Sequence, residues 1–380
     1  MKIAAMLFIL LLIVVLLGVL YAKYRLDNTP DKKNLETAIE AEVEKAMRGG
    51  LFPGLVVGIY KDGVVFIKGY GTVNKEAAEI PDATTAFQIG SISKVFTASL
   101  LQSLCDEGVV AMDATLGELI GNLMALSPSV QSVTLRQLVT HTSGFARIPK
   151  SIGARVTSMA GDADPLLNPY SYLEPQAVFE YLASADDMRA PGRFEYSNFG
   201  MGLLGHVLEI VAGEPYEKLV AEKVLAPLGM DNTAITPTPE IQARLAQAYN
   251  AKGVPTDVWT FASLAGAGAF YSNAEDMMKF IQANLEQSGA AGQGFLKMRE
   301  PQFKGDTGIG WLQPGFLDRL FGNRDVVWHN GMVGGYASYM SIDITTRTGV
   351  VILTNQANSV DMLGMMLTRQ VRTQSWTSGL

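Results

Sequence analysis

The chain is organised around residues 87–108, which begin Phe87-Gln88-Ile89-Gly90-Ser91-Ile92-Ser93-Lys94 and continue as an apolar run to Gly108. Ser91 and Lys94 lie three positions apart, so on a helix they share one face and the lysine amine reaches the serine hydroxyl. A helix that begins near Gly90 also directs free backbone N–H groups and its positive dipole end toward Ser91. A serine hydroxyl is a poor nucleophile at neutral pH unless a base or a cation assists its deprotonation. The pair therefore predicts acyl transfer by Ser91 with help from Lys94.

Two further stretches strengthen this hypothesis. They are Tyr196-Ser197-Asn198 and Trp328-His329-Asn330-Gly331. Together with the Ser91 stretch, and in this order, they resemble the three motifs of penicillin-recognising serine hydrolases: Ser-x-x-Lys, Tyr-x-Asn and a Lys/His-x-Gly strand.

Longer segments carry the same resemblance, namely residues 135–144, 196–230 and 266–276. They look like landmarks of the class C β-lactamase-like and penicillin-binding-protein-like serine hydrolases. That family includes β-lactamases, D-alanyl-D-alanine peptidases and family VIII carboxylesterases. The resemblance covers the chain from about Leu35 to the C-terminus, so it implies a fold and an activity for nearly the whole protein.

Composition excludes several other kinds of protein. The 380 residues are 48% hydrophobic and 18% charged, which is typical of a globular enzyme with one added apolar segment. A net charge of −7 without a basic stripe argues against a nucleic-acid partner. One cysteine, three histidines and no His-Glu-x-x-His motif make a catalytic zinc site improbable, so we expect no metal and no cofactor. The Gly-x-Ser-x-Gly elbow of α/β-hydrolases is also absent from the sequence.

The N-terminal segment predicts a membrane anchor. Residues 3–22 carry no charge, and a helix of this length spans about 30 Å of hydrocarbon. A cleaved signal usually has a shorter apolar region and a small-x-small cleavage site, so we favour an uncleaved transmembrane anchor over residues 1–22. Residues 23–33 read as a linker. The resemblance implies a catalytic domain outside the cytoplasm, periplasmic or extracellular, and a secreted protein if the segment is cleaved.

The pattern over residues 34–380 predicts a single domain of strands and helices, which the resemblance implies is a β-lactamase-like serine hydrolase domain. Strands are expected at 55–60, 64–70, 326–329, 336–343 and 349–354, with helices at 34–47, 200–211 and 360–371. Strands at both ends and helices between them indicate an α/β lobe (34–90 and 300–380) interrupted by a mainly helical lobe (91–299). The resemblance implies a β-lactamase/transpeptidase-like fold: a five-stranded antiparallel sheet flanked by helices, with the site between the lobes.

The motifs suggest a role for each residue. Ser91 is the predicted nucleophile. The base is either Tyr196 as a phenolate, favoured by the Lys94 cation, or Lys94 as a free amine, and the two are expected to titrate as a pair. The amide of Asn198 would donate to a substrate carbonyl and accept from Lys94. The backbone N–H of Ser91 and, by resemblance, that of Met332 would form the oxyanion hole.

The third motif departs from the pattern of many relatives. His329 stands where β-lactamases and peptidases of this family often have a lysine that binds the substrate carboxylate, and Asn330 replaces a frequent threonine or serine. Histidine is mostly neutral at pH 7, so we expect weaker carboxylate binding. Gly331 suits a strand that a substrate backbone approaches closely. These substitutions favour an esterase, or a peptidase/amidase with another substrate, over a dedicated β-lactamase.

Two other functions remain as alternatives. The first is a catalytically inactive, membrane-anchored penicillin-binding or sensing protein that uses the same cleft. The second is a structural role, for which the sequence offers no polymer-like repeat. The expected partners are a small-molecule or peptide substrate and, through the N-terminal helix, a membrane, and the sequence does not predict an oligomeric state.

Overall fold

The computed structural model describes residues 34–160, 168–286, 289–302, 307–315 and 325–376, together with residues 17, 18, 20 and 319. The predicted anchor (1–22) and linker (23–33) lie outside these ranges, apart from residues 17, 18 and 20. Within the described ranges, no helix has both the length and the hydrophobicity needed to cross a bilayer.

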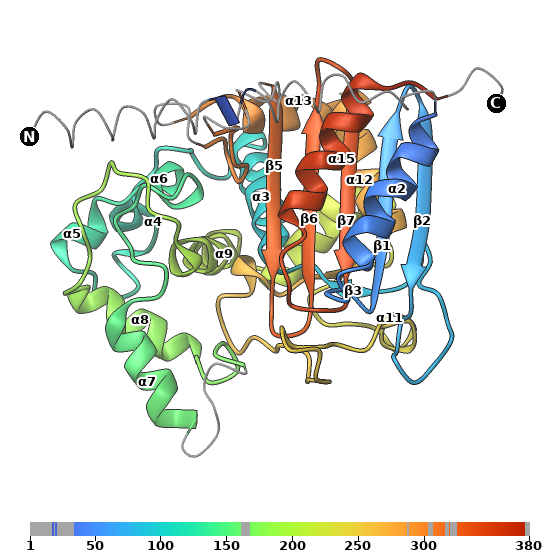
Figure 1. Cartoon of the computed structure of the whole chain (residues 1–380). Helices are drawn as coiled ribbons and strands as arrows, with labels where there is room; N and C mark the ends of the chain where they lie inside the picture. The colour runs from blue at the N-terminus through green and yellow to red at the C-terminus, as the bar shows by residue number, and fades with distance from the viewer. Residues whose placement is uncertain are drawn as a thin grey trace, which may run out of the picture.

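A five-stranded antiparallel sheet forms the larger lobe, as predicted (Figure 1). Its spatial order is β2-β1-β7-β6-β5, so strands from the two ends of the chain lie side by side. The strands are β1 (Gly54–Lys61), β2 (Val64–Gly71), β5 (Val326–Met332), β6 (Ala337–Asp343) and β7 (Thr348–Thr354). The predicted strand positions are therefore confirmed to within a few residues.

The hairpin between β1 and β2 shows why the chain reverses there. Lys61 pairs with Val64, which leaves a loop of only Asp62 and Gly63. Both loop residues have positive φ, 55° and 83°. This is the geometry of a type I′ turn, which matches the twist of the flanking strands and which Asp-Gly adopts readily.

Helices cover both faces of the sheet. On one face lie α2 (Leu35–Met47) and α15 (Asp361–Thr373), and on the other lies α12 (Ala274–Glu286) (Figure 1). Alternate residues of β1 serve the two faces: Leu55 and Val57 join the cluster under α2 and α15, whereas Val56 joins the main core. The sequence placed α12 in the helical lobe, although it packs on the sheet. The exact lobe boundaries stay a prediction.

A mainly helical lobe lies beside the sheet (Figure 1). Its helices are α4 (Leu116–Ile120), α5 (Pro128–Gln131), α6 (Leu135–Val139), α7 (Lys150–Ala160), α8 (Pro175–Ser184) and α9 (Asn198–Ala212). Other elements between β2 and β5 in the chain are β3 (Phe87–Gln88), α10 (Tyr216–Val220), α11 (Pro239–Ala243), η4 (Ala265–Ala267), β4 (Tyr271–Ser272) and α13 (Gly289–Arg299).

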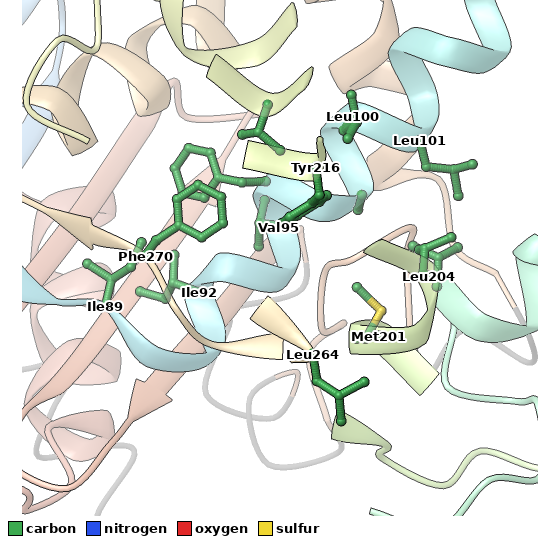
Figure 2. Close-up of a cluster of buried hydrophobic side chains, with 14 of the residues drawn as sticks. Ile89, Ile92, Val95, Leu100, Leu101, Met201, Leu204, Tyr216, Leu264 and Phe270 are labelled. Carbon is green, nitrogen blue, oxygen red and sulfur yellow. The ribbon is translucent and has the colours of Figure 1, made fainter. Parts of the chain in front are cut away.

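The helix that carries Ser91 and Lys94 runs through the core. A 3₁₀ turn, η1 (Gly90–Ile92), leads directly into α3 (Ser93–Asp106), most of whose residues are buried. Figure 2 shows Val95 and Leu101 of α3 in one apolar cluster with Met201 and Leu204 of α9. Because packing surrounds α3, its first turn is held rigidly at the junction of the two lobes.

Candidate active site

Ser91 lies in the η1 turn, tightly against the end of β5. Gly90 has φ +50°, and a Cβ added there would lie 2.7 Å from the Met332 backbone nitrogen. Only glycine allows this combination of backbone conformation and close approach. The glycine therefore brings the backbone of the serine turn next to that of β5.

Lys94 contacts the serine as the sequence predicted. Its Nζ donates to Ser91 Oγ at 2.9 Å and to the Ala267 carbonyl oxygen at 2.5 Å. The lysine side chain is fully buried, and within the described chain no acidic group forms an ion pair with it. Burial, and secondarily the nearby charge of Arg147, holds the pKa of Lys94 well below its usual value. The environment thus favours a neutral amine, which is able to accept a proton.

Tyr196 completes the predicted triad. Its hydroxyl lies near enough to the Ser91 side chain for the serine to lower its pKa by hydrogen bonding, and Lys94 Nζ lies 5.1 Å from the centre of its ring. The pKa of the Tyr196 phenol is raised to about 12 by burial, which outweighs the lowering effects of the Ser91 hydrogen bond and of Arg147. Sequence reasoning expected the Lys94 cation to lower this pKa. The structure shows the opposite, because burial disfavours both the ammonium and the phenolate.

His141 packs against the ring of Tyr196. The two rings lie 4.4 Å apart, and His141 Nδ1 accepts a hydrogen bond from the Ser197 N–H at 3.1 Å. His141 is buried, has a left-handed backbone with φ +58°, and has its pKa lowered well below 6.5, mainly by burial. A neutral imidazole is required for Nδ1 to accept. His141 therefore holds the segment that carries Tyr196.

Asn198 lies at the same cleft, and among the described residues the nitrogen of its side-chain amide is hydrogen-bonded while the oxygen is not. Its Nδ2 donates to the Tyr170 hydroxyl at 2.7 Å. Its Oδ1 is buried and has no hydrogen-bond partner in the part of the chain that the structure describes, so the expected bond from Lys94 is not formed. A buried acceptor without a partner is costly, and such atoms are often found where a ligand binds.

The residues of β5 divide between the two faces of the sheet, because strand side chains alternate. His329 faces the site, with its ring centre 6.2 Å from that of Tyr196. Its Nδ1 donates to the Asn330 carbonyl oxygen at 2.6 Å. Burial, reinforced by Lys94, lowers the pKa of His329 to about 3, so its imidazole is neutral. Asn330 points the other way, since its Nδ2 donates to Asp361 Oδ2 at 2.8 Å. The structure does not bring the Asn330 side chain to the site.

Backbone geometry at the end of β5 fits the predicted oxyanion hole. The N–H of Val333 donates to the Tyr336 carbonyl oxygen across the turn between β5 and β6, whereas the N–H of Trp328 donates to the Leu312 carbonyl oxygen, away from β6. Donor directions alternate along an antiparallel strand, so the N–H of Met332 points outward like that of Trp328, toward the serine turn.

Gly331 and Ser91 complete this arrangement. A Cβ on Gly331 would lie 2.0 Å from the Ile89 carbonyl oxygen, so only glycine allows β5 to approach the serine turn this closely. The N–H of Ser91 lies in a first helical turn, where N–H groups have no intrahelical acceptor. Gly90 and Gly331 thus bring together the backbone segments that carry the Ser91 and Met332 N–H groups, and an oxyanion hole formed by these two groups stays a prediction.

A cavity of about 470 Å³ opens beside Ser91. Its walls include residues that the motifs did not indicate, notably Arg147, Tyr170 and Trp259. The Arg147 guanidinium carbon lies 5.3 Å from the centre of the Tyr196 ring, which places a cation at the cleft. These three residues lie in loops, whose placement no motif spacing encodes. In the described ranges, no three His, Cys, Asp or Glu side chains are grouped to hold a metal ion.

Comparison with known proteins tests the family directly. The beta-lactamase family model matches residues 39–371. The chain belongs to the beta-lactamase family. The predicted resemblance is therefore confirmed.

Individual relatives agree with this membership. The chain is 29% identical over 356 residues to human "Putative beta-lactamase-like 1", covering 84% of this chain and 65% of that protein. It is 26% identical over 357 residues to a beta-lactamase from Pseudomonas fluorescens, covering 85% and 94%. A beta-lactamase/D-alanine carboxypeptidase structure from Pseudomonas syringae superposes with a TM-score of 0.76 at 21% identity, covering 90% and 99%. The last match establishes the β-lactamase/transpeptidase-like fold.

Proposed function

We propose that this member of the beta-lactamase family is a serine hydrolase that forms an acyl-enzyme on Ser91. The observation that carries the proposal is the 2.9 Å contact from the buried Lys94 amine to Ser91 Oγ. A neutral amine at this distance is a general base for the hydroxyl proton. Lys94, rather than a Tyr196 phenolate, is accordingly the base that we propose for the free enzyme.

The reaction then follows from the geometry. Ser91 Oγ attacks the substrate carbonyl carbon while its proton passes to Lys94 Nζ. The carbonyl oxygen becomes an oxyanion and accepts hydrogen bonds from the N–H groups of Ser91 and Met332. The Tyr196 phenol protonates the leaving group as the C–O or C–N bond breaks, and it recovers its proton from the Lys94 ammonium. Water repeats these steps on the acyl-enzyme and releases the acid.

The substrate that we propose is an ester or a peptide/amide, in preference to a β-lactam. Support comes from His329, whose neutral imidazole leaves β5 without a positive charge at position 329 for the carboxylate of a β-lactam. Relatives with β-lactamase or D-alanyl-D-alanine-carboxypeptidase in their names make the β-lactam and peptide substrates the natural comparisons.

The test compares turnover of p-nitrophenyl esters, a D-alanyl-D-alanine peptide and a chromogenic cephalosporin. We expect ester or peptide hydrolysis to exceed cephalosporin hydrolysis, and Ser91→Ala to abolish all three. Ser103→Ala is the matched control, because Ser103 lies on the same helix about three turns away. Binding of penicillin without turnover of any substrate would instead support the inactive penicillin-binding or sensing protein.

We also propose that residues 1–22 anchor the enzyme with its catalytic domain outside the cytoplasm. The uncharged run of residues 3–22 supports this proposal. Fractionation of cells that produce the full chain or residues 34–380 tests it. Of these two forms, only the full chain should sediment with membranes. Its catalytic domain should be accessible to protease added outside the cytoplasm.

A further inference from the structure

The cavity beside Ser91 has mostly apolar walls. Helix α7 contributes Ile152 and Val156, and other segments contribute Ile148, Leu173, Phe261 and Val333. On another side, the Tyr170 and Phe261 rings stack with their centres 4.6 Å apart. Its volume of about 470 Å³ lies within the range of small-molecule sites and leaves room beyond the carbonyl that reacts. Such a space favours an apolar part of a ligand, because burial removes that part from water.

One residue of α7 at this cavity is a glycine, although the packing of neighbouring atoms does not require a glycine there. Gly153 lines the cavity, and a Cβ added to it would meet no atom of the described chain within 4 Å. Gly202 on α9 is different, because its Cβ would lie 2.4 Å from the Leu264 side chain. Glycine within a helix costs up to about 1 kcal/mol relative to alanine. Since neighbouring protein atoms do not require this glycine, the open space above it points to a ligand.

The position of Tyr196 decides which part of the substrate enters the cavity. In the proposed reaction the leaving group lies at Tyr196, which protonates it. Tyr196 is not among the residues that line the cavity, whereas Ser91, Met332 and Asn198 are. The side of the reacting carbonyl that faces the cavity is therefore the acyl side.

We propose that the enzyme acts on substrates with a bulky apolar acyl group, and that this group fills the cavity over Gly153. This inference rests on the proposed acyl-enzyme function and names the substrate class of that site. The acyl carbonyl lies at Ser91, and its hydrocarbon part extends along α7 between Ile152 and the Tyr170 ring. The unpartnered Asn198 Oδ1 lies on the same wall, where it is able to accept a hydrogen bond from a polar N–H or O–H near the carbonyl.

A series of p-nitrophenyl esters with straight acyl chains from acetyl to decanoyl tests the proposal. Each methylene that enters an apolar site should raise kcat/KM about fourfold, until the cavity is full. The Gly153→Ala and Gly153→Phe variants progressively fill the open space. We expect Gly153→Phe to lower the ratio of kcat/KM for the hexanoyl ester to that for the acetyl ester at least tenfold, and Gly153→Ala to lower it less. Ser158→Phe, on the opposite and exposed face of α7, is the matched control and should leave the ratio unchanged.

A fluorophosphonate label on Ser91 separates this inference from the proposed function. If Ser91 is labelled but kcat/KM does not rise with chain length, or if Gly153→Phe and Ser158→Phe change the ratio equally, the acyl cavity is wrong and the hydrolase remains. If Ser91 is not labelled, both proposals fail. Gly153→Ala keeps the test decisive if the phenylalanine variant does not fold, because alanine is a favourable helix residue with space around its Cβ.

Discussion

Replacement of Lys94 by methionine separates the catalytic cost of this residue from its effect on stability. Methionine keeps most of the buried volume but removes the amine that contacts Ser91 Oγ and the Ala267 carbonyl oxygen. Loss of a positioned general base typically lowers the rate 100- to 10,000-fold. We therefore expect kcat/KM for a p-nitrophenyl ester to fall by about this factor in Lys94→Met, while the protein still folds.

Stability should respond differently and should depend on pH. In the folded state the pKa of Lys94 is lowered by burial, whereas in the unfolded chain it has its ordinary value near 10.5. The unfolded state therefore binds more protons between these two values, and wild-type stability rises there with pH. Below the folded-state pKa of Lys94, burial of the amine destabilises the folded protein by its full amount. This destabilisation disappears as pH approaches 10.5. The slope in this window is about 1.4 kcal/mol per pH unit.

Chemical denaturation at a series of pH values below 10.5 measures this effect. Between the lowered folded-state pKa of Lys94 and 10.5, the free energy of unfolding of wild type should rise relative to that of Lys94→Met by about 1.4 kcal/mol per pH unit. The Ala267 carbonyl loses a donor in the variant, which adds an offset of about 1–3 kcal/mol, so the slope and not the offset is diagnostic. Lys252→Met, at an exposed lysine, is the control and should run parallel to wild type. Parallel curves for Lys94→Met and wild type would refute a neutral Lys94.

Three further predictions concern the same cleft. With Lys94 as base, kcat/KM should fall as pH drops through the lowered pKa of this lysine and should be level above it; a profile that still climbs beyond pH 10 would assign the base to Tyr196, whose pKa is about 12. Arg147→Gln should lower kcat/KM for carboxylate-bearing esters about tenfold relative to neutral esters, because it removes the cation at the cleft; equal losses for both esters would contradict this. His329→Lys should raise kcat/KM for carboxylate-bearing esters relative to kcat/KM for neutral esters. An unchanged ratio of the two would show that position 329 does not face the carboxylate.

Local patterns in the sequence predicted much of the fold. The β1–β2 hairpin follows from two alternating runs joined by Asp-Gly, and its turn geometry is set by those two residues alone. The contact between Ser91 and Lys94 follows from helical spacing. Such features depend on neighbours in the sequence, so they can be predicted without knowing the rest of the structure.

Features that depend on tertiary packing could not be predicted in the same way. Arg147 reaches the Tyr196 ring from a loop about fifty residues away, and no periodicity encodes that contact. The pKa of Tyr196 was expected to fall because of a nearby lysine, but burial changes the charge state of the lysine itself. Asn330 was assigned to the site because it stands in the third motif where relatives often have threonine or serine, but its side chain faces the opposite side of the sheet from His329.

The most direct measurement of the central claim is peptide mapping by mass spectrometry after reaction with an alkyl fluorophosphonate. This reagent modifies a serine only where its hydroxyl is activated as a nucleophile. We predict one adduct, on the peptide that contains Ser91, which disappears in Ser91→Ala and persists in Ser103→Ala. An unmodified wild-type protein, or an adduct that survives in Ser91→Ala, would contradict the assignment of Ser91 as the nucleophile.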